Sequence, residues 1–242
     1  MTRAVIMAGG EGTRLRPFTH SIPKPLLPIG RKPIAQIIIE RLRDCGILHI
    51  TMAVNYGAEL IRAYFGHGSQ FGVELDYYHE PRKLGTAGAL AQIIKPDDEP
   101  FLVTNGDILT ALDYGTFLRD HVAAKAAMTV ATRNDTMTIP YGVLRFDGNG
   151  NVEGVTEKPS TNYTFSAGIY ALAAAAVAHI PREQPLDMTD LMNTLAATRE
   201  GVRAHPIEGL WFDLANVDDF EKALAELEQK DPIFFRDVTH HS

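Results

Sequence analysis

The sequence predicts an α/β fold, in which a mixed, mostly parallel central sheet lies between two layers of helices. Two observations lead to this prediction. In the first half of the chain, short apolar runs alternate with segments whose apolar residues recur at helical spacing, which is typical of parallel strands joined by helices. In the second half, strand-like runs follow one another across polar or glycine-rich turns, which indicates antiparallel pairing.

The expected elements follow in order along the chain. In the first half, strands are expected at 3–8, 47–54, 72–78 and 101–104, and helices at 33–45, 58–65, 86–94 and 114–124. In the second half, strands are expected at 128–132, 141–146, 152–156 and 165–171, and helices at 173–179, 186–198 and from Val217 onward. The segment DGNGN at 147–151 is a strong hairpin signal between two of these strands.

Composition narrows the range of partners. The net charge of −7 argues against broad binding of nucleic acid. No apolar stretch reaches the ~18 residues of a membrane span, and the apolar pentad at 4–8 is shorter than the ~7–15 residues of a signal-peptide core. The single cysteine, Cys45, rules out an internal disulfide and fits a reducing compartment. We therefore expect a cytoplasmic protein that binds neither nucleic acid nor a membrane.

The opening segment carries the strongest local signal. Residues 9–17, GGEGTRLRP, directly follow the first expected strand, where a glycine-rich turn can expose backbone N–H groups to a phosphate. The segment lacks the GKS or GKT of a P-loop and the third glycine of a dinucleotide-binding fingerprint. Arg14 follows the turn, and Lys24 lies between two of the prolines that stiffen residues 17–33. These features predict a site for a polyphosphate.

Several motifs together point to one family. GGEGTRLRP followed by PKPLLPIGRKP (23–33) resembles the signature of the sugar-1-phosphate nucleotidylyltransferases. Further motifs occur in the family's order: LGTAGAL (84–90), NGD (105–107), YGV (141–143), EKP (157–159), AGIY (167–170) and WFD (211–213). The resemblance implies a Rossmann-like three-layer α/β/α fold with a single domain at 1–230 and a tail at 231–242. Residues about 1–125 would form its nucleotide-binding half and about 126–230 its sugar-phosphate-binding half.

The implied reaction joins an NTP to a sugar 1-phosphate, giving an NDP-sugar and pyrophosphate. The sugar's ionised phosphate attacks the α-phosphorus in line, so positioning and charge neutralisation supply most of the catalysis. By resemblance, the catalytic residues are Arg14, Lys24, Asp107, Lys158 and Asp213, and Asp107 and Asp213 hold a Mg²⁺ cofactor. Solvated surface lysines and a helix-capping aspartate remain alternatives for these positions. The segment LANVDDF after Asp213 departs from the family's glycine-threonine-proline pattern, so the resemblance does not predict the backbone conformation there.

The resemblance also assigns the binding residues. Nucleotide contacts fall to Ala8, Gly9, Gly10, Gly12, Thr13, Arg14, Glu80, Gly85, Thr86, Asn105 and Gly106. Sugar-phosphate contacts fall to Tyr141, Gly142, Glu157, Lys158, Ser166, Ala167 and Gly168. Ser166 stands where many relatives have asparagine, and Tyr141 could instead pack in the core.

Glu80 bears on the choice of base. It lies five positions before Gly85, where uridylyl and thymidylyl members of the family have a glutamine that reads the pyrimidine. An ionised carboxylate only accepts hydrogen bonds, and guanine presents the N1–H and 2-amino donors side by side. The residue thus favours GTP, with a mannose or manno-heptose 1-phosphate as the sugar. The alternatives are that Glu80 points to solvent, or that the enzyme uses UTP or dTTP with glucose 1-phosphate or another hexose 1-phosphate.

Other classes of function stay open. A non-catalytic regulatory relative should have lost residues of the loop or metal site, and all of them are present here. An oxidoreductase should carry the glycine fingerprint that this chain lacks. The chain ends soon after its last expected helix, so we expect one activity without an acyltransferase domain. Many family members associate, which leaves a homo-oligomer as an alternative to a monomer.

Overall fold

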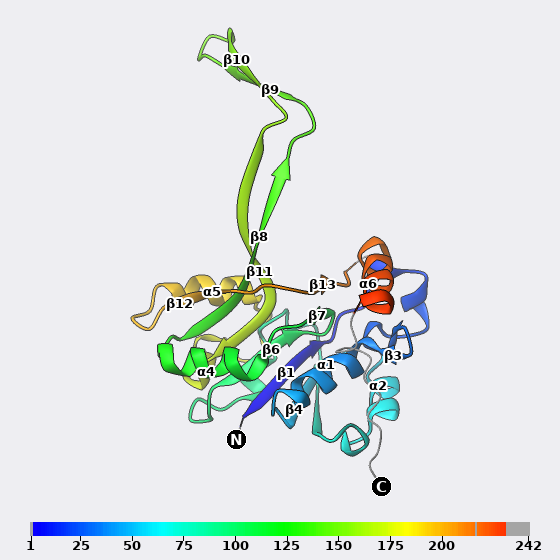
Figure 1. Cartoon of the computed structure of the whole chain (residues 1–242). Coiled ribbons are helices and arrows are strands. Elements are labelled where there is room, and N and C mark those ends of the chain that lie inside the picture. The colour runs from blue at the N-terminus through cyan, green and yellow to red at the C-terminus, as the bar shows by residue number, and fades with distance from the viewer. Residues whose placement is uncertain (1, 216, 231–242) are drawn as a thin grey trace.

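A seven-stranded mixed sheet forms the middle of the molecule (Figure 1). The computed structural model describes residues 2–215 and 217–230, so the tail expected at 231–242 lies outside the described residues. The strands stand in the order β12 (Val202–Pro206), β8 (Met128–Thr138), β11 (Ser160–Leu172), β6 (Phe101–Asn105), β1 (Arg3–Ala8), β4 (His49–Val54) and β5 (Glu74–His79). The strands β6, β1, β4 and β5 are parallel, and β11 is antiparallel to both of its neighbours.

Helices cover both faces of this sheet. The side chains of β1 alternate, so Ala4, Ile6 and Ala8 face one core while Val5 faces a second. The first core takes side chains from α1 (Ile34–Asp44), α2 (Ala58–Phe65) and α4 (Tyr114–Ala124). The second takes them from α3 (Leu90–Ile93), α5 (Met188–Ala196) and the 3₁₀ helix η5 (Ala174–His179). The predicted three-layer α/β fold is therefore confirmed.

Shorter elements connect the strands and helices, and most of them lie near the carboxyl ends of the parallel strands. Three 3₁₀ helices follow β1, namely η1 (Thr13–Leu15), η2 (Phe18–His20) and η3 (Lys24–Leu26), and another, η4 (Ser69–Phe71), precedes β5. The two-residue strands β2 (Pro28–Ile29) and β3 (Lys32–Pro33) pair ahead of α1. The strands β7 (Ile108–Thr110) and β13 (Trp211–Asp213) pair in a small antiparallel sheet, and α6 (Val217–Lys230) follows β13.

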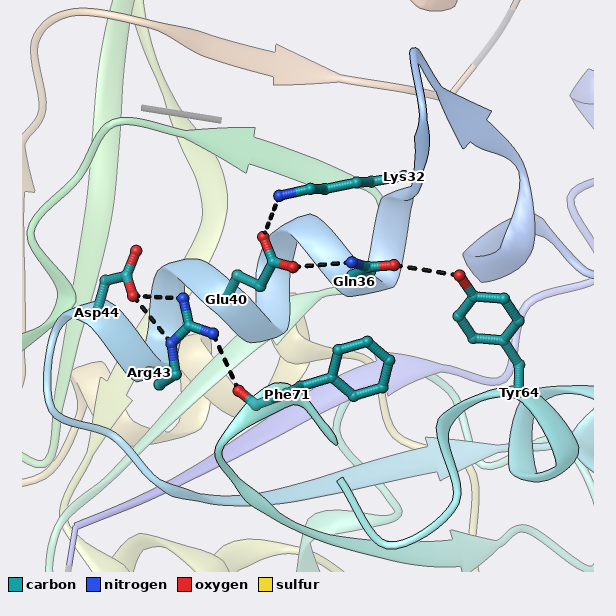
Figure 2. Close-up of polar contacts among 7 residues, drawn as sticks. All are labelled: Lys32, Gln36, Glu40, Arg43, Asp44, Tyr64 and Phe71. Carbon is teal, nitrogen blue, oxygen red and sulfur yellow. Dashed lines mark hydrogen bonds and ion pairs between the residues drawn. The ribbon is translucent and has the colours of Figure 1, made fainter. Parts of the chain in front are cut away.

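The helix α1 shows how an amphipathic pattern becomes a packed element. Its apolar stripe is buried, as the sequence predicts, and a polar network lies along its outer face (Figure 2). Lys32 Nζ lies 2.7 Å from Glu40 Oε2, and Gln36 Nε2 donates to Glu40 Oε1 at 2.8 Å. The Tyr64 hydroxyl donates to Gln36 Oε1 at 3.2 Å. The network therefore joins α1 to α2 and to β3.

A long β-arm leaves the sheet. The strands β8 and β11 continue to pair well beyond the body, and β9 (Gly142–Phe146) and β10 (Val152–Glu157) form a hairpin at the far end (Figure 1). We call residues 133–166 the arm. The strands expected at 141–146 and 152–156 are confirmed as β9 and β10, but those expected at 128–132 and 165–171 are longer in the structure, reaching Thr138 and starting at Ser160. The added residues are mostly exposed, so no buried face marks them in the sequence.

Other differences have local causes. The helix expected at 86–94 shrinks to Leu90–Ile93, because Gly85 has a φ of +75° and Gly88 lies so close to Leu84 that a Cβ there would be 2.3 Å from the Leu84 carbonyl oxygen. The segment expected as a helix at 173–179 is a 3₁₀ helix. The edge strand β12 was not expected, since its short run is mostly exposed and ends in Pro206.

Candidate active site

The opening loop is built around one glycine. Gly12 has a φ of +63°, and a Cβ there would lie 2.8 Å from the Thr19 Cγ2 atom. Thr19 is buried, and its hydroxyl donates to the Gly12 carbonyl oxygen at 2.8 Å. The chain then turns into η1, with Thr13 and Arg14 exposed. A side chain at position 12 would open this turn, so the glycine fixes the place at which Arg14 leaves the loop.

Lys24 stands on a stiff support, as expected. Pro23 and Pro25 on either side are buried, and a Cβ on Gly57 would lie 2.7 Å from Pro23. The Lys24 ammonium group donates to Asp107 Oδ2 in an ion pair that is mostly shielded from solvent. The prolines thus deliver a lysine from the opening segment to the end of β6.

Asp107 and Asp213 arrive side by side from distant parts of the chain. Gly106 N donates to the Met7 carbonyl oxygen at 2.9 Å, which holds the NGD turn against the end of β1. Asp213 pairs with Ile108 in the β7–β13 ladder, and Leu214 N donates to the Asp107 carbonyl oxygen at 3.0 Å. The departure from the family pattern after Asp213 therefore leaves this carboxylate beside Asp107.

The charged side chains of Arg14, Lys24, Asp107 and Asp213 lie close enough to affect one another at the carboxyl edge of the sheet. Burial raises the pKa of the Asp213 carboxyl, and the charge of Asp107 raises it further, while Lys24 and Arg14 lower it. A cation between the two carboxylates would relieve their repulsion. The described residues contain no cluster of three or more histidine, cysteine, aspartate or glutamate side chains that could hold a metal ion. Two carboxylates that leave positions for water and phosphate suit Mg²⁺.

Glu80 is buried at the end of β5. Only 5% of the residue is exposed, and its Oε2 accepts a hydrogen bond from Leu84 N at 3.2 Å. The other oxygen, Oε1, packs against the opening loop, 2.9 Å from where a Cβ on Gly9 would lie. Burial is the main cause that raises the pKa of this carboxyl. The side chain therefore faces the start of the loop and not open solvent.

Gly85 and Thr86 are engaged by the protein itself. A Cβ on Gly85 would lie 2.6 Å from the Leu186 carbonyl oxygen. Thr86 N donates to Asp187 Oδ1 at 3.1 Å, and Met188 N donates to the Thr86 hydroxyl at 2.7 Å. This segment therefore anchors the start of α5 beside the loop that holds Glu80.

Three of the predicted sugar-phosphate residues lie at the base of the arm, next to Asn105. A Cβ on Gly168 would lie 2.9 Å from Asn105 Nδ2. The carbonyl oxygen of Ala167 accepts a hydrogen bond from Trp211 Nε1 at 2.9 Å, and the Ser166 hydroxyl donates to the Tyr170 hydroxyl at 2.9 Å. The structure thus brings Ser166, Ala167 and Gly168 to the carboxyl edge of the sheet.

The other four lie on the outer part of the arm. Gly142 and Glu157 face each other in the β9–β10 ladder, and Glu157 Oε2 lies 3.0 Å from where a Cβ on Gly142 would be. Lys158 N donates to the Tyr141 carbonyl oxygen at 3.2 Å, and the φ of Lys158 is +46°, in the region that favours glycine. All four are exposed. The structure keeps them together but does not bring them to Lys24 and Asp107 of the same chain.

Two groups near the site were not singled out from the sequence. Lys83 Nζ lies 2.6 Å from Glu11 Oε1, which places another cation beside the opening loop. The Arg133 guanidinium lies over the Trp211 ring, 5.7 Å from its centroid, at the base of the arm. For Lys83 the available signal was its place directly before LGTAGAL, but Arg133 lies far from WFD in the sequence and nothing there shows that the two meet.

The fold is that of a nucleotidyl transferase. A family model with the description "Nucleotidyl transferase" matches residues 3–230, and the chain belongs to this family. The resemblance to sugar-1-phosphate nucleotidylyltransferases is thereby confirmed. In the described part of the chain, no helix has the length and apolar character needed to cross a membrane.

Individual relatives differ in the base that their names give. The chain is 34% identical over 241 residues to a UTP–glucose-1-phosphate uridylyltransferase of Synechocystis sp.. It is 32% identical over 225 residues to the mannose-1-phosphate guanylyltransferase catalytic subunit beta of Drosophila pseudoobscura pseudoobscura. These alignments cover 92% and 90% of this chain but 62% and 60% of those proteins, so the chain spans about three-fifths of their length.

A solved structure shares the architecture. HddC from Yersinia pseudotuberculosis, complexed with GMP-PN, superimposes with a TM-score of 0.71 at 25% sequence identity. The match covers 94% of this chain and 100% of that one.

Proposed function

We propose that this chain transfers a nucleotidyl group from an NTP to a sugar 1-phosphate, giving an NDP-sugar and pyrophosphate. The observation that carries the proposal is the group of Arg14, Lys24, Asp107 and Asp213, which the opening segment, the NGD turn and β13 bring to the carboxyl edge of the sheet. Open α/β sheets bind ligands at this edge. Membership of the nucleotidyl transferase family supports the same reaction.

The residues would divide the work by charge. An oxygen of the sugar phosphate forms a bond to the α-phosphorus as the bond to the leaving pyrophosphate breaks. Arg14 and the backbone N–H groups of the opening loop would stabilise the negative charge on pyrophosphate, and Lys24 would neutralise the α-phosphate. Asp107 and Asp213 would hold Mg²⁺, which supplies further neutralisation of the phosphate oxygens.

The base we propose is guanine. Glu80 is buried against Gly9, where a carboxylate could accept the two adjacent donors of the guanine edge. The complex of HddC with GMP-PN and the mannose-1-phosphate guanylyltransferase relative support this choice. The uridylyltransferase relative favours UTP, which makes a uridylyltransferase the second candidate. The sugar we propose is mannose 1-phosphate or a manno-heptose 1-phosphate.

The test is pyrophosphate release with Mg²⁺, measured over GTP, UTP, dTTP and ATP against mannose, manno-heptose, glucose and glucosamine 1-phosphates. Release confined to GTP would support both the reaction and the role of Glu80. Release with UTP or dTTP alone would keep the reaction and reject guanine. A folded protein without release on any pair, and without nucleotide binding by calorimetry, would contradict the proposed reaction.

A further inference from the structure

A continuous ladder holds the inner part of the arm straight. Its two strands pair without interruption from Ser166 and Thr132 to Ser160 and Thr138. Side chains add to the ladder, because the Thr136 hydroxyl donates to Asn162 Oδ1 at 2.8 Å and the hydroxyls of Thr138 and Ser160 lie 2.8 Å apart. Between Ser166 and Ser160 the strand extends about 20 Å, at about 3.4 Å per residue. This length is several times the reach of a lysine side chain.

The base of the arm is fixed as well. The one register shift in the described β8–β11 pairing lies between Ser166 and Tyr170, where Ala167 and Gly168 are buried. Trp211 Nε1 holds the Ala167 carbonyl oxygen, and Arg133 donates to the Gly209 carbonyl oxygen at 2.9 Å. Folding the arm back onto its own site would break these contacts or the ladder. Lys158 is thus held away from Asp107 of its own chain.

The hairpin at the end of the arm exposes an apolar face. Its cross-strand pairs Leu144–Val155 and Phe146–Val152 lie on the same side as the Gly142–Glu157 pair, because side chains two positions apart share a face. The exposed fractions of Phe146, Val152 and Val155 are 58%, 58% and 61%. A two-stranded hairpin is marginal in water alone, and a contiguous exposed apolar surface marks an interaction site. The face that carries Glu157 is therefore built to be covered.

The arm and the candidate site lie at the same edge of the body. Ile169 of β11 pairs with Thr104 of β6, and β11 is antiparallel to β6, so the arm extends beyond the edge at which Asp107 lies. When two copies face each other across a two-fold axis perpendicular to their arms, each arm runs toward the other copy's site. No further chain is needed to cover both hairpins.

We propose that the arm completes the active site of a second copy of this chain. In this homodimer, the apolar face of each hairpin packs on the partner and places Glu157 and Lys158 beside the partner's Arg14, Lys24 and Asp107. The inference rests on the proposed function, because it gives Lys158 to the sugar phosphate. Each site is then formed by the body of one copy and the arm of the other.

Sedimentation equilibrium tests the dimer without reference to activity. We expect the wild-type protein to be a dimer, and Val155→Asp to make it a monomer with an unchanged far-UV circular dichroism spectrum. Leu60→Asp is the matched control, because Leu60 is 51% exposed on α2, and it should stay dimeric. A wild-type monomer at micromolar concentration, or a Val155→Asp dimer, would overturn the proposal.

A pair of inactive variants tests the shared site. Asp107→Asn disables the body and Lys158→Ala disables the arm, so each homodimer should be inactive. Co-expression with two different tags and tandem purification isolates the heterodimer, which retains one intact site. We expect about half the wild-type rate per dimer from it. No rate from the heterodimer would show that each arm serves its own chain, and an active Lys158→Ala homodimer would remove the arm from the site.

These readouts separate the two proposals. If the wild-type protein turns over no substrate pair and binds no nucleotide, but sediments as a dimer that Val155→Asp dissociates, the reaction fails and the interface stands. If it turns over a substrate while sedimenting as a monomer, the reaction stands and the shared site fails.

Discussion

At the scale of single residues, Arg14 is the cation that the opening loop delivers. Arg14→Ala should lower kcat/KM about 100-fold, since it removes a charged donor from the leaving pyrophosphate. Arg31→Ala removes another exposed arginine from the turn between β2 and β3 and should leave the kinetics unchanged. Steady-state kinetics of both variants and of the wild type test this prediction. An Arg14→Ala variant with the same kcat/KM as Arg31→Ala would exclude Arg14 from the mechanism.

Glu80 links base choice to stability. Glu80→Gln should lower kcat/KM for GTP relative to UTP by roughly tenfold or more, because an amide cannot accept both guanine donors.

Burial raises the pKa of Glu80, so the folded state binds the proton more tightly than the unfolded state and ionisation costs stability as pH rises. The variant should therefore have a higher Tm at pH 7 without ligand. Glu59→Gln, at an exposed position of α2, should change neither quantity.

His121 should make stability depend on pH. It is buried, its Nδ1 lies 2.9 Å from the Thr129 hydroxyl oxygen, and burial lowers its pKa from the ordinary 6.5. Between that lowered value and pH 6.5 the unfolded chain binds more protons, so its contribution to stability is lost as pH falls through this window. Thermal unfolding from pH 7 to 5 should show a shallower fall in Tm for His121→Gln than for wild type. His67→Gln, at an exposed position, should follow wild type.

At the scale of elements, the network on α1 offers a clean comparison. Only 12% of each side chain of the Lys32–Glu40 pair is exposed, and Glu40 also accepts a hydrogen bond from Gln36. Glu40→Ala should reduce the free energy of unfolding by about 2 to 3 kcal/mol, because it leaves a shielded charge without this partner. Glu74→Ala should cost far less in urea denaturation, since Glu74 is 68% exposed in its pair with His49.

Most of the elements that the sequence predicts have a buried face. The strand β1 and the helix α1 each have one, so their apolar spacing shows in the letters. The outer strands of the arm have no covered face within the chain, and RNDTMT (133–138) and STNYT (160–164) therefore read as loop. The expected strands at 128–132 and 165–171 therefore stop close to where burial stops, although the backbone pairing continues. The exposed hairpin strands were predicted because the DGNGN turn signal lies between them.

At the scale of the whole molecule, motif order predicts candidate site residues but not how the fold distributes them. Arg14, Lys24, Asp107 and Asp213 meet on the body, because the sheet carries the ends of its parallel strands to one edge. Gly142 and Glu157 meet each other on the arm. The order of motifs along the chain does not reveal the path of the backbone between them. It therefore could not show that the candidate site residues divide into a group on the body and a group on the arm.

Metal and nucleotide should bind with positive coupling. In calorimetric titrations, the affinity for Mg²⁺ should rise when GTP is present, and the affinity for GTP should rise by the same factor with Mg²⁺. Lys24→Met should reduce this coupling while strengthening the binding of Mg²⁺ alone, since it removes the ammonium group from Asp107. Equal Mg²⁺ affinities with and without nucleotide in the wild type would contradict the expectation.

The Lys24–Asp107 ion pair is the reason for the expected coupling between Mg²⁺ and GTP, because in the free protein the Lys24 ammonium group already neutralises Asp107. A divalent cation that binds alone would have to displace the Lys24 ammonium group from Asp107, and that ammonium group would then have no anionic ligand to pair with. A divalent cation that binds together with a triphosphate would provide the Lys24 ammonium group with a new anionic partner. Metal binding to Asp107 and phosphate binding to Lys24 would then favour each other. If Asp107 and Asp213 hold Mg²⁺ as proposed, Lys24 would set the order of loading, because metal alone would bind poorly until a phosphate ligand is present.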